Sequence, residues 1–221
     1  MDLLFERAPA YWSTATANTA DSDSILSVIE HITHLARGWT EERIAIARQF
    51  LAQFSDQTIA NVIARVTRGP FCHVEVRLHD GHCFSAHFIE GVRWARLVDV
   101  TPPRWECISI PWQETTEALA WASSIVGWGY DTLGAILSGF NVPIVVANRS
   151  FCSRVVAEFL SRSGVLDVPV DPNPNKLYQW AFRVADPDPH PAQPATASTD
   201  LTSAAPGAAC AVGGTYHKAR E

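Results

Sequence analysis

The feature that most restricts the fold is a strict alternation of apolar and polar residues from Phe71 to Leu78. A period of two predicts a half-buried strand, with valines on the covered side and polar side chains on the other. The polar side carries, in order along the strand, His73, Glu75 and Arg77. The turn signal HDG follows directly, and the next apolar segment predicts the return strand of a β-hairpin.

The length of the hairpin loop decides which side chains lie opposite one another. With a three-residue loop that ends at a left-handed Gly81, His73 lies opposite His87. With a two-residue loop, Phe88 takes that place and His87 points to the other side. We favour the three-residue loop because it gathers polar side chains on one face and keeps the valines together. The four residues gathered there are His73, Glu75, Ser85 and His87.

A second informative segment runs from Asn148 to Gly164 and has the apolar spacing of an amphipathic helix. Ser150 is expected to cap its start, and Gly164 is expected to end it. Cys152 therefore falls in the first turn, where unpaired backbone amides and the helix dipole favour negative charge. Such surroundings favour the thiolate form of a cysteine and can hold an oxyanion during acyl transfer.

Composition limits the classes of function. The chain of 221 residues has a formal charge of -6 and no basic stripe, which argues against nucleic-acid binding. Its five cysteines are odd in number and irregularly spaced, unlike a disulfide framework. No secretory signal is expected at the start, and no apolar stretch reaches the ~18 residues of a transmembrane helix. We therefore expect a protein made in the cytoplasm, with any delivery to the periplasm or another cell by a route independent of a signal peptide.

The pattern along the chain divides it into three parts. Residues 1–55 predict a short strand at Asp2–Phe5 and then helices, as an N-terminal helical region or insertion that could bind a protein partner. Residues 56–185 contain the hairpin and the cysteine helix. Residues 186–221 hold hardly any large apolar residue, so they predict a disordered tail. Expected N-caps of further helices are Thr40, Ser55 and Asp131.

Five segments stand out together: TRGPFCHVEVRLHDG, GVR, GWGYDTLGAIL, FCSRVVAEFLSRSG and NPNKLYQW. Together they resemble the permuted NlpC-type papain-like hydrolases, the YiiX/YaeF-like group, which is related to the lecithin:retinol acyltransferase-like proteins. The resemblance covers about residues 56–183. It implies an α+β fold with an antiparallel sheet packed against the nucleophile helix, and a histidine strand that precedes the cysteine helix.

The resemblance also implies roles for individual residues, with Cys152 as nucleophile and His73 as base. In the family, a polar residue on the strand after the histidine orients the base, but the matching stretch here is FSAHF, which has no carboxylate. We expect His87 to orient His73, because the acyltransferase-like relatives place a second histidine on that strand. Ser85 is the alternative to His87 as orienting residue, and Glu75 and Tyr130 are further candidates for a third or supporting role.

Strand geometry gives the same preference for His87 over Glu75. Glu75 stands two residues along the same strand, so it lies about 7 Å from His73 in that direction. A residue directly opposite on the neighbouring strand has its Cβ only about 5 Å away. The cross-strand His87 is therefore expected to make the hydrogen bond.

The implied activity is that of a thiol-dependent amidase or endopeptidase, with a peptide amide of the bacterial cell wall as substrate. The same dyad could instead hydrolyse or transfer a lipid acyl group, as in the acyltransferase-like relatives. An inactive binding module on the same fold is the alternative from another class. Cysteines and histidines around the hairpin match no zinc-finger spacing, and Cys72 is expected in the core beside the valines. We therefore expect neither a metal nor another cofactor.

Overall fold

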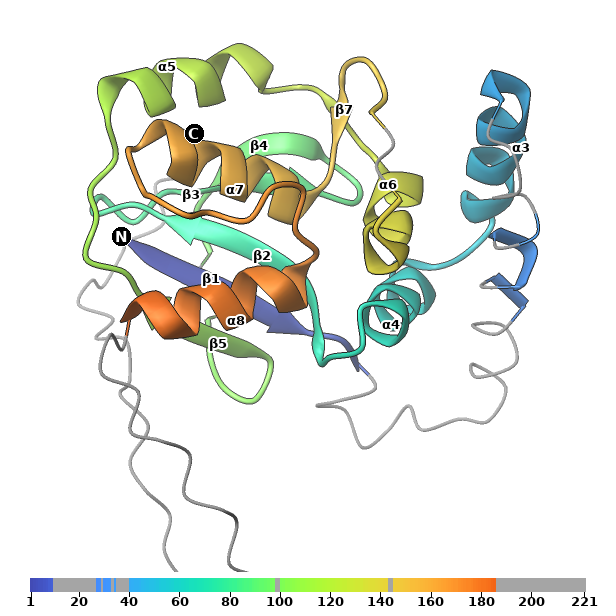
Figure 1. Cartoon of the computed structure of the whole chain (residues 1–221), viewed down its shortest axis with the longest axis horizontal. Helices are drawn as coiled ribbons and strands as arrows, with labels where there is room; N and C mark the ends of the chain where they lie inside the picture. The colour runs from blue at the N-terminus through green and yellow to red at the C-terminus, as the bar shows by residue number, and fades with distance from the viewer. Residues whose placement is uncertain are drawn as a thin grey trace, which may run out of the picture. The chain divides into compact units, whose positions relative to one another are not determined.

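The computed structural model describes residues 1–9, 27–28, 30–32, 34, 40–97, 100–142 and 145–185. This part of the chain has an α+β fold, in which a five-stranded antiparallel sheet packs against helices (Figure 1). The predicted tail at 186–221 lies outside the described residues. Of the helices in the described ranges, none is long and apolar enough to cross a membrane.

The sheet has the strand order β4-β3-β2-β1-β5, and each neighbouring pair is antiparallel. The strand predicted near the start of the chain is therefore an inner strand, paired with β2 on one side and β5 on the other. The strands are β1 (Asp2–Arg7), β2 (Phe71–Arg77), β3 (Cys83–His87), β4 (Gly91–Ala95) and β5 (Trp105–Ser109).

The helices begin at capping residues that the sequence predicts. The side chains of Thr40, Ser55 and Asp131 each accept a hydrogen bond from a backbone N–H three residues on, which confirms the three expected caps. Two short strands, β6 (Gly129–Tyr130) and β7 (Arg149–Ser150), pair in parallel, and a 3-10 turn, η1, spans Ser138–Phe140. The helices are α3 (Glu41–Leu51), α4 (Asp56–Val66), α5 (Thr116–Ile125), α6 (Thr132–Leu137), α7 (Cys152–Arg162) and α8 (Pro174–Ala185).

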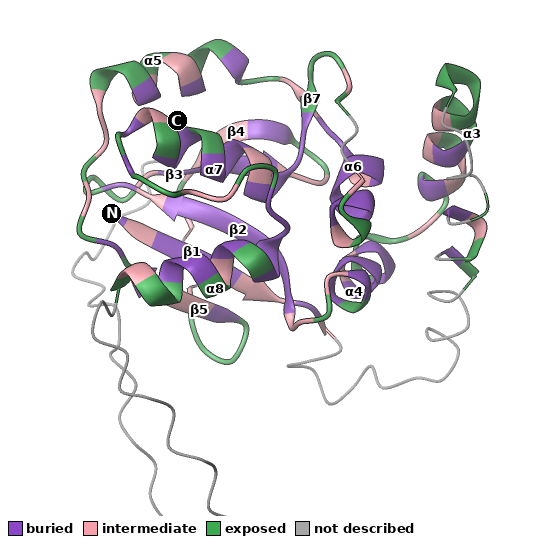
Figure 2. Ribbon diagram, in the orientation of Figure 1, coloured by how far each residue is buried: buried purple, intermediate pink, exposed green. Residues whose placement is uncertain are grey.

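The main core lies between the sheet and helices α7 and α8, whose inner faces are buried while their outer faces are exposed (Figure 2). Leu3 and Phe5 of β1 belong to this core, and Leu4 between them belongs to a second, smaller cluster with Cys83 and Trp105. Because successive strand residues point to opposite faces, the sheet has apolar contacts on both sides.

The β2–β3 hairpin has the predicted three-residue loop. The Leu78 N–H donates to the His82 carbonyl at 2.8 Å, and Gly81 is left-handed with φ 84°. Val76 pairs with Phe84, which is the register expected from the favoured loop length. This part of the sequence analysis is confirmed.

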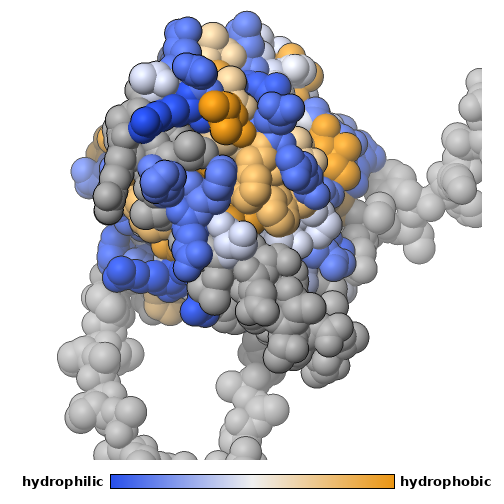
Figure 3. All heavy atoms as spheres, turned by 90° about the vertical axis from the view of Figure 1, so that its right-hand side faces the viewer, coloured by the Kyte–Doolittle hydropathy of each residue, from blue (hydrophilic) through white to orange (hydrophobic). Residues whose placement is uncertain are grey.

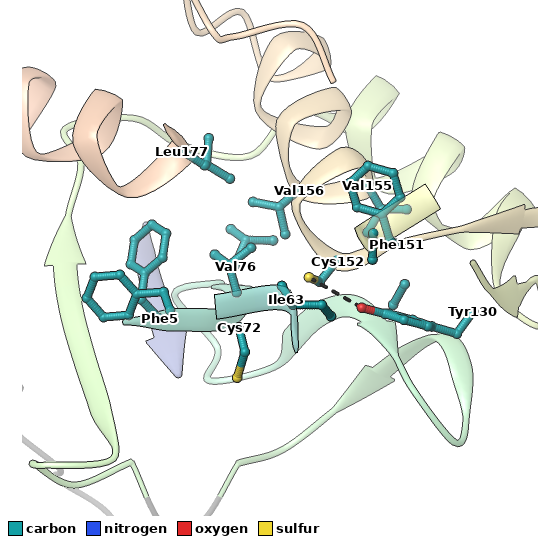
Figure 4. Packing of buried hydrophobic residues seen from close by; sticks show 14 of the residues in the cluster. Phe5, Ile63, Cys72, Val76, Tyr130, Phe151, Cys152, Val155, Val156 and Leu177 are labelled. Carbon is teal, nitrogen blue, oxygen red and sulfur yellow. Dashed lines mark hydrogen bonds between the residues drawn. The ribbon is translucent and has the colours of Figure 1, made fainter. Parts of the chain in front are cut away.

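An irregularity at the start of β2 changes the place of Cys72. Glu6 pairs with His73 and Arg7 pairs with Phe71, so Cys72 is an extra residue with no partner of its own on β1. Such a bulge interrupts the alternation of side chains. Cys72 is buried in the main core cluster, but its side chain extends from β2 on the opposite side to Val76 (Figure 4). It therefore does not pack beside the valines in the way that simple alternation predicts.

Candidate active site

Cys152 is the first residue of helix α7, and Phe151, in an extended conformation, is the N-cap. Ser150 is not the cap, which corrects the sequence prediction, because it belongs to β7 and pairs there with Tyr130. Within the described part of the chain, the N-cap of this helix makes no side-chain hydrogen bond, and the thiol lies beside the amides of the first turn.

His73 connects Cys152 to the polar face of the sheet. Burial alone would lower the pKa of this imidazole, because it disfavours the charged ring. Hydrogen bonds to Cys152 and to Glu75, together with the charges of these two groups, outweigh burial and raise the pKa from 6.5 to about 10. The protonated ring is therefore strongly favoured when it lies between the thiolate and the carboxylate.

The side chain within hydrogen-bond distance of His73 is Glu75 and not His87, which differs from the contact expected from strand spacing. The Nε2 atom of His73 lies 3.1 Å from Oε1 of Glu75. The His87 ring stands edge-on to that of His73 at 5.9 Å between centroids, and its Nδ1 accepts the Ile89 N–H at 3.4 Å. The hairpin register is as predicted, but a glutamate side chain is long enough to bridge alternate positions of one strand.

Arg93 holds Glu75 in this position from two strands away. Its Nη2 donates to Oε1 of Glu75 at 3.2 Å, the same oxygen that meets His73. On β4, Arg93 pairs with Ser85, whose small side chain turns its hydroxyl to the Val74 carbonyl at 2.7 Å. The sequence contains a signal for the contact between Arg93 and Glu75. The GVR segment pairs with β3, and this pairing places an arginine on the polar face of the sheet.

The carboxylate of Glu75 is almost fully buried, with 1% of the residue exposed. Burial acts to raise its pKa, but the hydrogen bond and charge of His73, followed by the charge of Arg93, lower it below 4.5. Glu75 is therefore ionised at neutral pH and stabilises positive charge on His73.

Tyr130 lies on the other side of the thiol. Its hydroxyl is 3.9 Å from Sγ of Cys152 and points toward it (Figure 4). The pairing of β6 with β7 fixes this position, since Tyr130 lies beside Ser150, two residues before the cysteine. Burial first, and then the neighbouring thiol, raises the pKa of Tyr130 well above its ordinary value, so its hydroxyl remains a proton donor.

The NPNKLY segment fixes the start of β2 next to α7. Asn175 accepts the Phe71 N–H at 3.1 Å and donates to the Phe71 carbonyl at 2.9 Å. Gly69 leaves room for this side chain, because a Cβ there would lie 2.2 Å from Oδ1 of Asn175. Ser153, in the first turn of α7, donates to the Pro172 carbonyl at 2.6 Å. One segment thus anchors both the histidine strand and the cysteine helix.

A cavity of about 300 Å³ lies directly beside this cluster. His73 and Tyr130 line it together with Cys72, while Cys152 lies behind them with 1% of its surface exposed. A further wall of this cavity comes from α4. The face of the molecule that is turned to the viewer in Figure 3 has apolar side chains among polar ones. Sequence analysis missed the α4 wall, because the apolar positions of α4 are indistinguishable from core positions. The wall residues are Ile59, Ala60 and Ile63.

Within the described ranges, no group of three or more His, Cys, Asp or Glu side chains is arranged to hold a metal ion. The site brings together the thiol of Cys152 with the phenol of Tyr130, and the imidazole of His73 with the carboxylate of Glu75. Comparisons with protein-family models, with curated proteins and with solved structures give no match. The assignment of a function accordingly depends on the geometry around Cys152.

Proposed function

We propose that the protein is a cysteine hydrolase of the permuted papain-like, NlpC type that cleaves an amide bond. The observation that carries this proposal is that His73, with Nε2 3.1 Å from Oε1 of Glu75, has its pKa raised by the neighbouring Cys152 at the start of helix α7. Nucleophile, base and orienting group are the three parts that such a reaction needs.

The contacts define a role for each nitrogen of His73. Nε2 meets the ionised Glu75, so it carries a proton, and Nδ1 remains for exchange with the thiol. The Cys152 thiolate attacks the carbonyl carbon, and the protonated His73 gives its proton to the departing amine. Water then attacks the thioester while His73 accepts a proton, which releases the acid and restores the thiolate and the protonated ring.

The negative charge that develops on the carbonyl oxygen needs donors. The Cys152 N–H, at the start of α7, is the first donor in this proposal. The Tyr130 hydroxyl, which remains protonated because of its raised pKa, is the second donor in this proposal. Neither group has to move far, since both already adjoin the sulfur atom.

For the substrate, we propose a peptide amide of the bacterial cell wall, as the resemblance of the His73 strand and the Cys152 helix to the permuted NlpC-type hydrolases implies. The order of the two elements supports this resemblance, because β2 precedes α7 along the chain and the two elements pack against each other in the main core. A lipid acyl ester would use the same dyad and is the competing substrate within the same class.

One observation favours a second function from a different class. Cys152 is only 1% exposed, so a substrate can reach the sulfur only if Tyr130 or another neighbour moves. A protein that retained this fold as a binding module would tolerate permanent burial of its cysteine. The reactivity of Cys152 therefore separates the two functions.

The proposal is tested by incubating purified protein with cell-wall peptide fragments and, separately, with phospholipid vesicles, and by identifying products by mass. We expect cleavage of an amide in the peptide fragments by the wild type and none by the Cys152→Ser variant. The matched control is Cys83→Ser, a buried cysteine outside the cluster, which should retain activity. Release of fatty acid instead would assign the lipid substrate, and no product with either substrate would favour the binding module.

A further inference from the structure

A second cavity, of about 490 Å³, adjoins the first and has no place in the mechanism above. Phe88 and Tyr130 line both cavities, so together they separate two parts of one depression. The second cavity is bounded by α3, by the start of β4 and by β6 and β7. We name it the arginine pocket, because its two basic residues are Arg48 and Arg149.

We propose that the arginine pocket binds a free carboxylate of the substrate, so that the preferred substrates are peptides with a carboxylate close to the cleaved amide. This inference depends on the proposed function, because it assigns a part of the substrate to a place beside Cys152. Its support comes from the wall of the pocket, from the unused donors of the two arginines and from their connection to Tyr130.

Three glycines, Gly91, Gly127 and Gly129, contribute to the wall of the arginine pocket. Gly91 is left-handed with φ 71°, and a Cβ there would lie 2.1 Å from the Trp128 carbonyl oxygen. The Val92 N–H donates to that same oxygen at 2.8 Å, which holds β4 against this segment. Gly129 lacks a side chain where one would lie 3.2 Å from Nη1 of Arg149. Gly91 therefore lets β4 pack closely against the Trp128 backbone, and Gly129 lets the Arg149 guanidinium lie close to the backbone.

Arg149 is fixed in place, but its charge is not neutralised. Its Nη1 donates to the Tyr130 carbonyl at 2.9 Å, and it makes no ion pair within the described part of the chain. An arginine already held by one hydrogen bond loses less freedom when it binds an anion, and its remaining donors match the geometry of a carboxylate.

Arg48 contributes a donor that is buried and unused. Its Nη2 has no hydrogen-bond acceptor, and the nearest carboxylate oxygen, Oδ1 of Asp131, is 3.7 Å away. That oxygen already accepts the Gly134 N–H as the cap of α6. The Arg48 charge is therefore partly offset by Asp131, while its Nη2 still lacks a hydrogen-bond acceptor among the described residues, which a bound carboxylate would supply. Glu90, the acid among the described residues that line the pocket, is 2.6 Å from Nε of Arg93, so Arg149 is left as a cation of the pocket with no ion pair in the described part of the chain.

Tyr130 links the arginine pocket to the nucleophile. Its hydroxyl adjoins Sγ of Cys152 and its carbonyl accepts from Arg149, so the two functions lie at opposite ends of one residue. A peptide whose cleaved amide lies at Cys152 therefore needs only a short further stretch to place a carboxylate between the two arginines.

The test uses two alkylating peptides that differ in one group: bromoacetyl-Ala-Ala with a free carboxylate, and the same peptide with a C-terminal amide. The rate of modification of Cys152 is measured by mass for each. In the wild type we expect the carboxylate reagent to react about tenfold faster, as one charge-assisted hydrogen bond would give. Arg149→Gln and Arg48→Gln should bring this ratio close to one, and Arg149→Lys should retain part of it.

The matched control is Arg183→Gln on α8, an exposed arginine outside both cavities, which should leave the ratio unchanged. A wild-type ratio of one, or a ratio that neither pocket variant lowers, overturns the inference while the proposed function stands. If neither reagent modifies Cys152, the proposed function fails instead. In that case calorimetric binding of acetyl-Ala-Ala, as carboxylate and as amide, still tests the pocket, and equal affinities overturn it.

Discussion

The Nε2 atom of His73 lies 3.1 Å from Oε1 of Glu75, although the two residues stand at alternate positions of one strand. The acidic partner of the histidine is thus local in sequence, whereas the thiol comes from a helix about eighty residues further along. Arg93, on a third element, holds the carboxylate from the side. This arrangement predicts that the reactivity of Cys152 depends on Glu75 more than on any other acid.

The first prediction compares Glu75→Gln with His87→Ala. Loss of the carboxylate removes a charge that favours protonated His73, so the ring assists the neighbouring Cys152 less. We expect iodoacetamide to modify Cys152 about tenfold more slowly at pH 7 in Glu75→Gln, which corresponds to one pKa unit for His73. The His87→Ala variant should differ from wild type by much less. A larger effect of His87→Ala would return the orienting role to the cross-strand histidine.

The second prediction concerns selectivity among the buried cysteines. Burial raises the pKa of Cys72 well above its usual value and that of Cys83 to about 11, so both remain thiols at neutral pH. We therefore expect iodoacetamide to modify Cys152 before either of them, although Cys72 also lines the cleft. Mass mapping after a short exposure provides the measurement. Earlier modification of Cys72 or Cys83, with Cys152 unmodified, would support the inactive binding module.

The third prediction is that two neighbouring histidines titrate in opposite directions. The pKa of His73 is raised to about 10 by Cys152 and Glu75 against the effect of burial, whereas burial and the charge of His73 lower that of His87. Because the folded pKa of His73 exceeds 6.5, its stabilising contribution is complete below pH 6.5 and is lost as the pH rises through about 10. NMR titration of the imidazole signals should show both shifts. In addition, the wild type should have a higher free energy of unfolding than His73→Asn at low pH, and this difference should decrease as the pH rises from 6.5 to about 10.

Absence of a signal from His73 that titrates above neutral pH would contradict this assignment. The Glu75→Gln variant provides the internal check, because its His73 midpoint should lie below that of the wild type. Glu75 makes the corresponding contribution to stability at acid pH, because its pKa is lowered in the folded protein. Its contribution to stability is therefore present above about pH 4.5 and is lost as the pH falls.

The fourth prediction separates oxyanion stabilisation from thiol reactivity. Tyr130→Phe removes the hydroxyl 3.9 Å from Sγ of Cys152, and with it the proposed second donor. We expect peptide hydrolysis to fall about 100-fold, as loss of one oxyanion donor typically causes. Alkylation by iodoacetamide should change far less, because it forms no oxyanion. Tyr178→Phe, distant from the thiol, is the matched control, and equal losses in both assays would refute the donor role.

The fifth prediction concerns the buried ion pair behind the site. Arg93→Met leaves the carboxylate of Glu75 buried with less positive charge around it, and should lower the free energy of unfolding by about 3 kcal/mol. The double variant Arg93→Met with Glu75→Gln should recover much of this loss, because no buried charge is then unpaired. Denaturant unfolding at pH 7 measures both. Additive losses in the double variant would mean that the two side chains do not stabilise one another.

Short sequence motifs were sufficient to predict the hairpin loop and the helix caps. The HDG loop fixed the hairpin register through a left-handed Gly81, and the caps at Thr40, Ser55 and Asp131 fall where predicted. The same rules failed where another part of the chain competes. Ser150 has the composition of a helix cap, but its backbone pairs with Tyr130 instead.

The identity of the orienting group was also beyond a local rule. Spacing between Cα atoms argued against Glu75, because it ignores the length of the side chain and the pull of Arg93 from another strand. The arginine pocket illustrates the same limit. Arg48 and Arg149 are about one hundred residues apart, and nothing in either local segment indicates that they share a cavity.

The pairing of Arg7 with Phe71 has a consequence for how such a protein can change. The Ala8 N–H donates to the Pro70 carbonyl at 2.8 Å, so the chain leaves β1 and enters β2 at adjacent points. Topologically, the sixty-odd residues between them occupy the place of a hairpin turn, and a long turn costs little more entropy than a short one. α4 belongs to this excursion and forms one wall of the cleft. A descendant could therefore exchange the whole excursion and with it this wall of the cleft, while every strand pairing beneath the cluster around Cys152 is inherited unchanged.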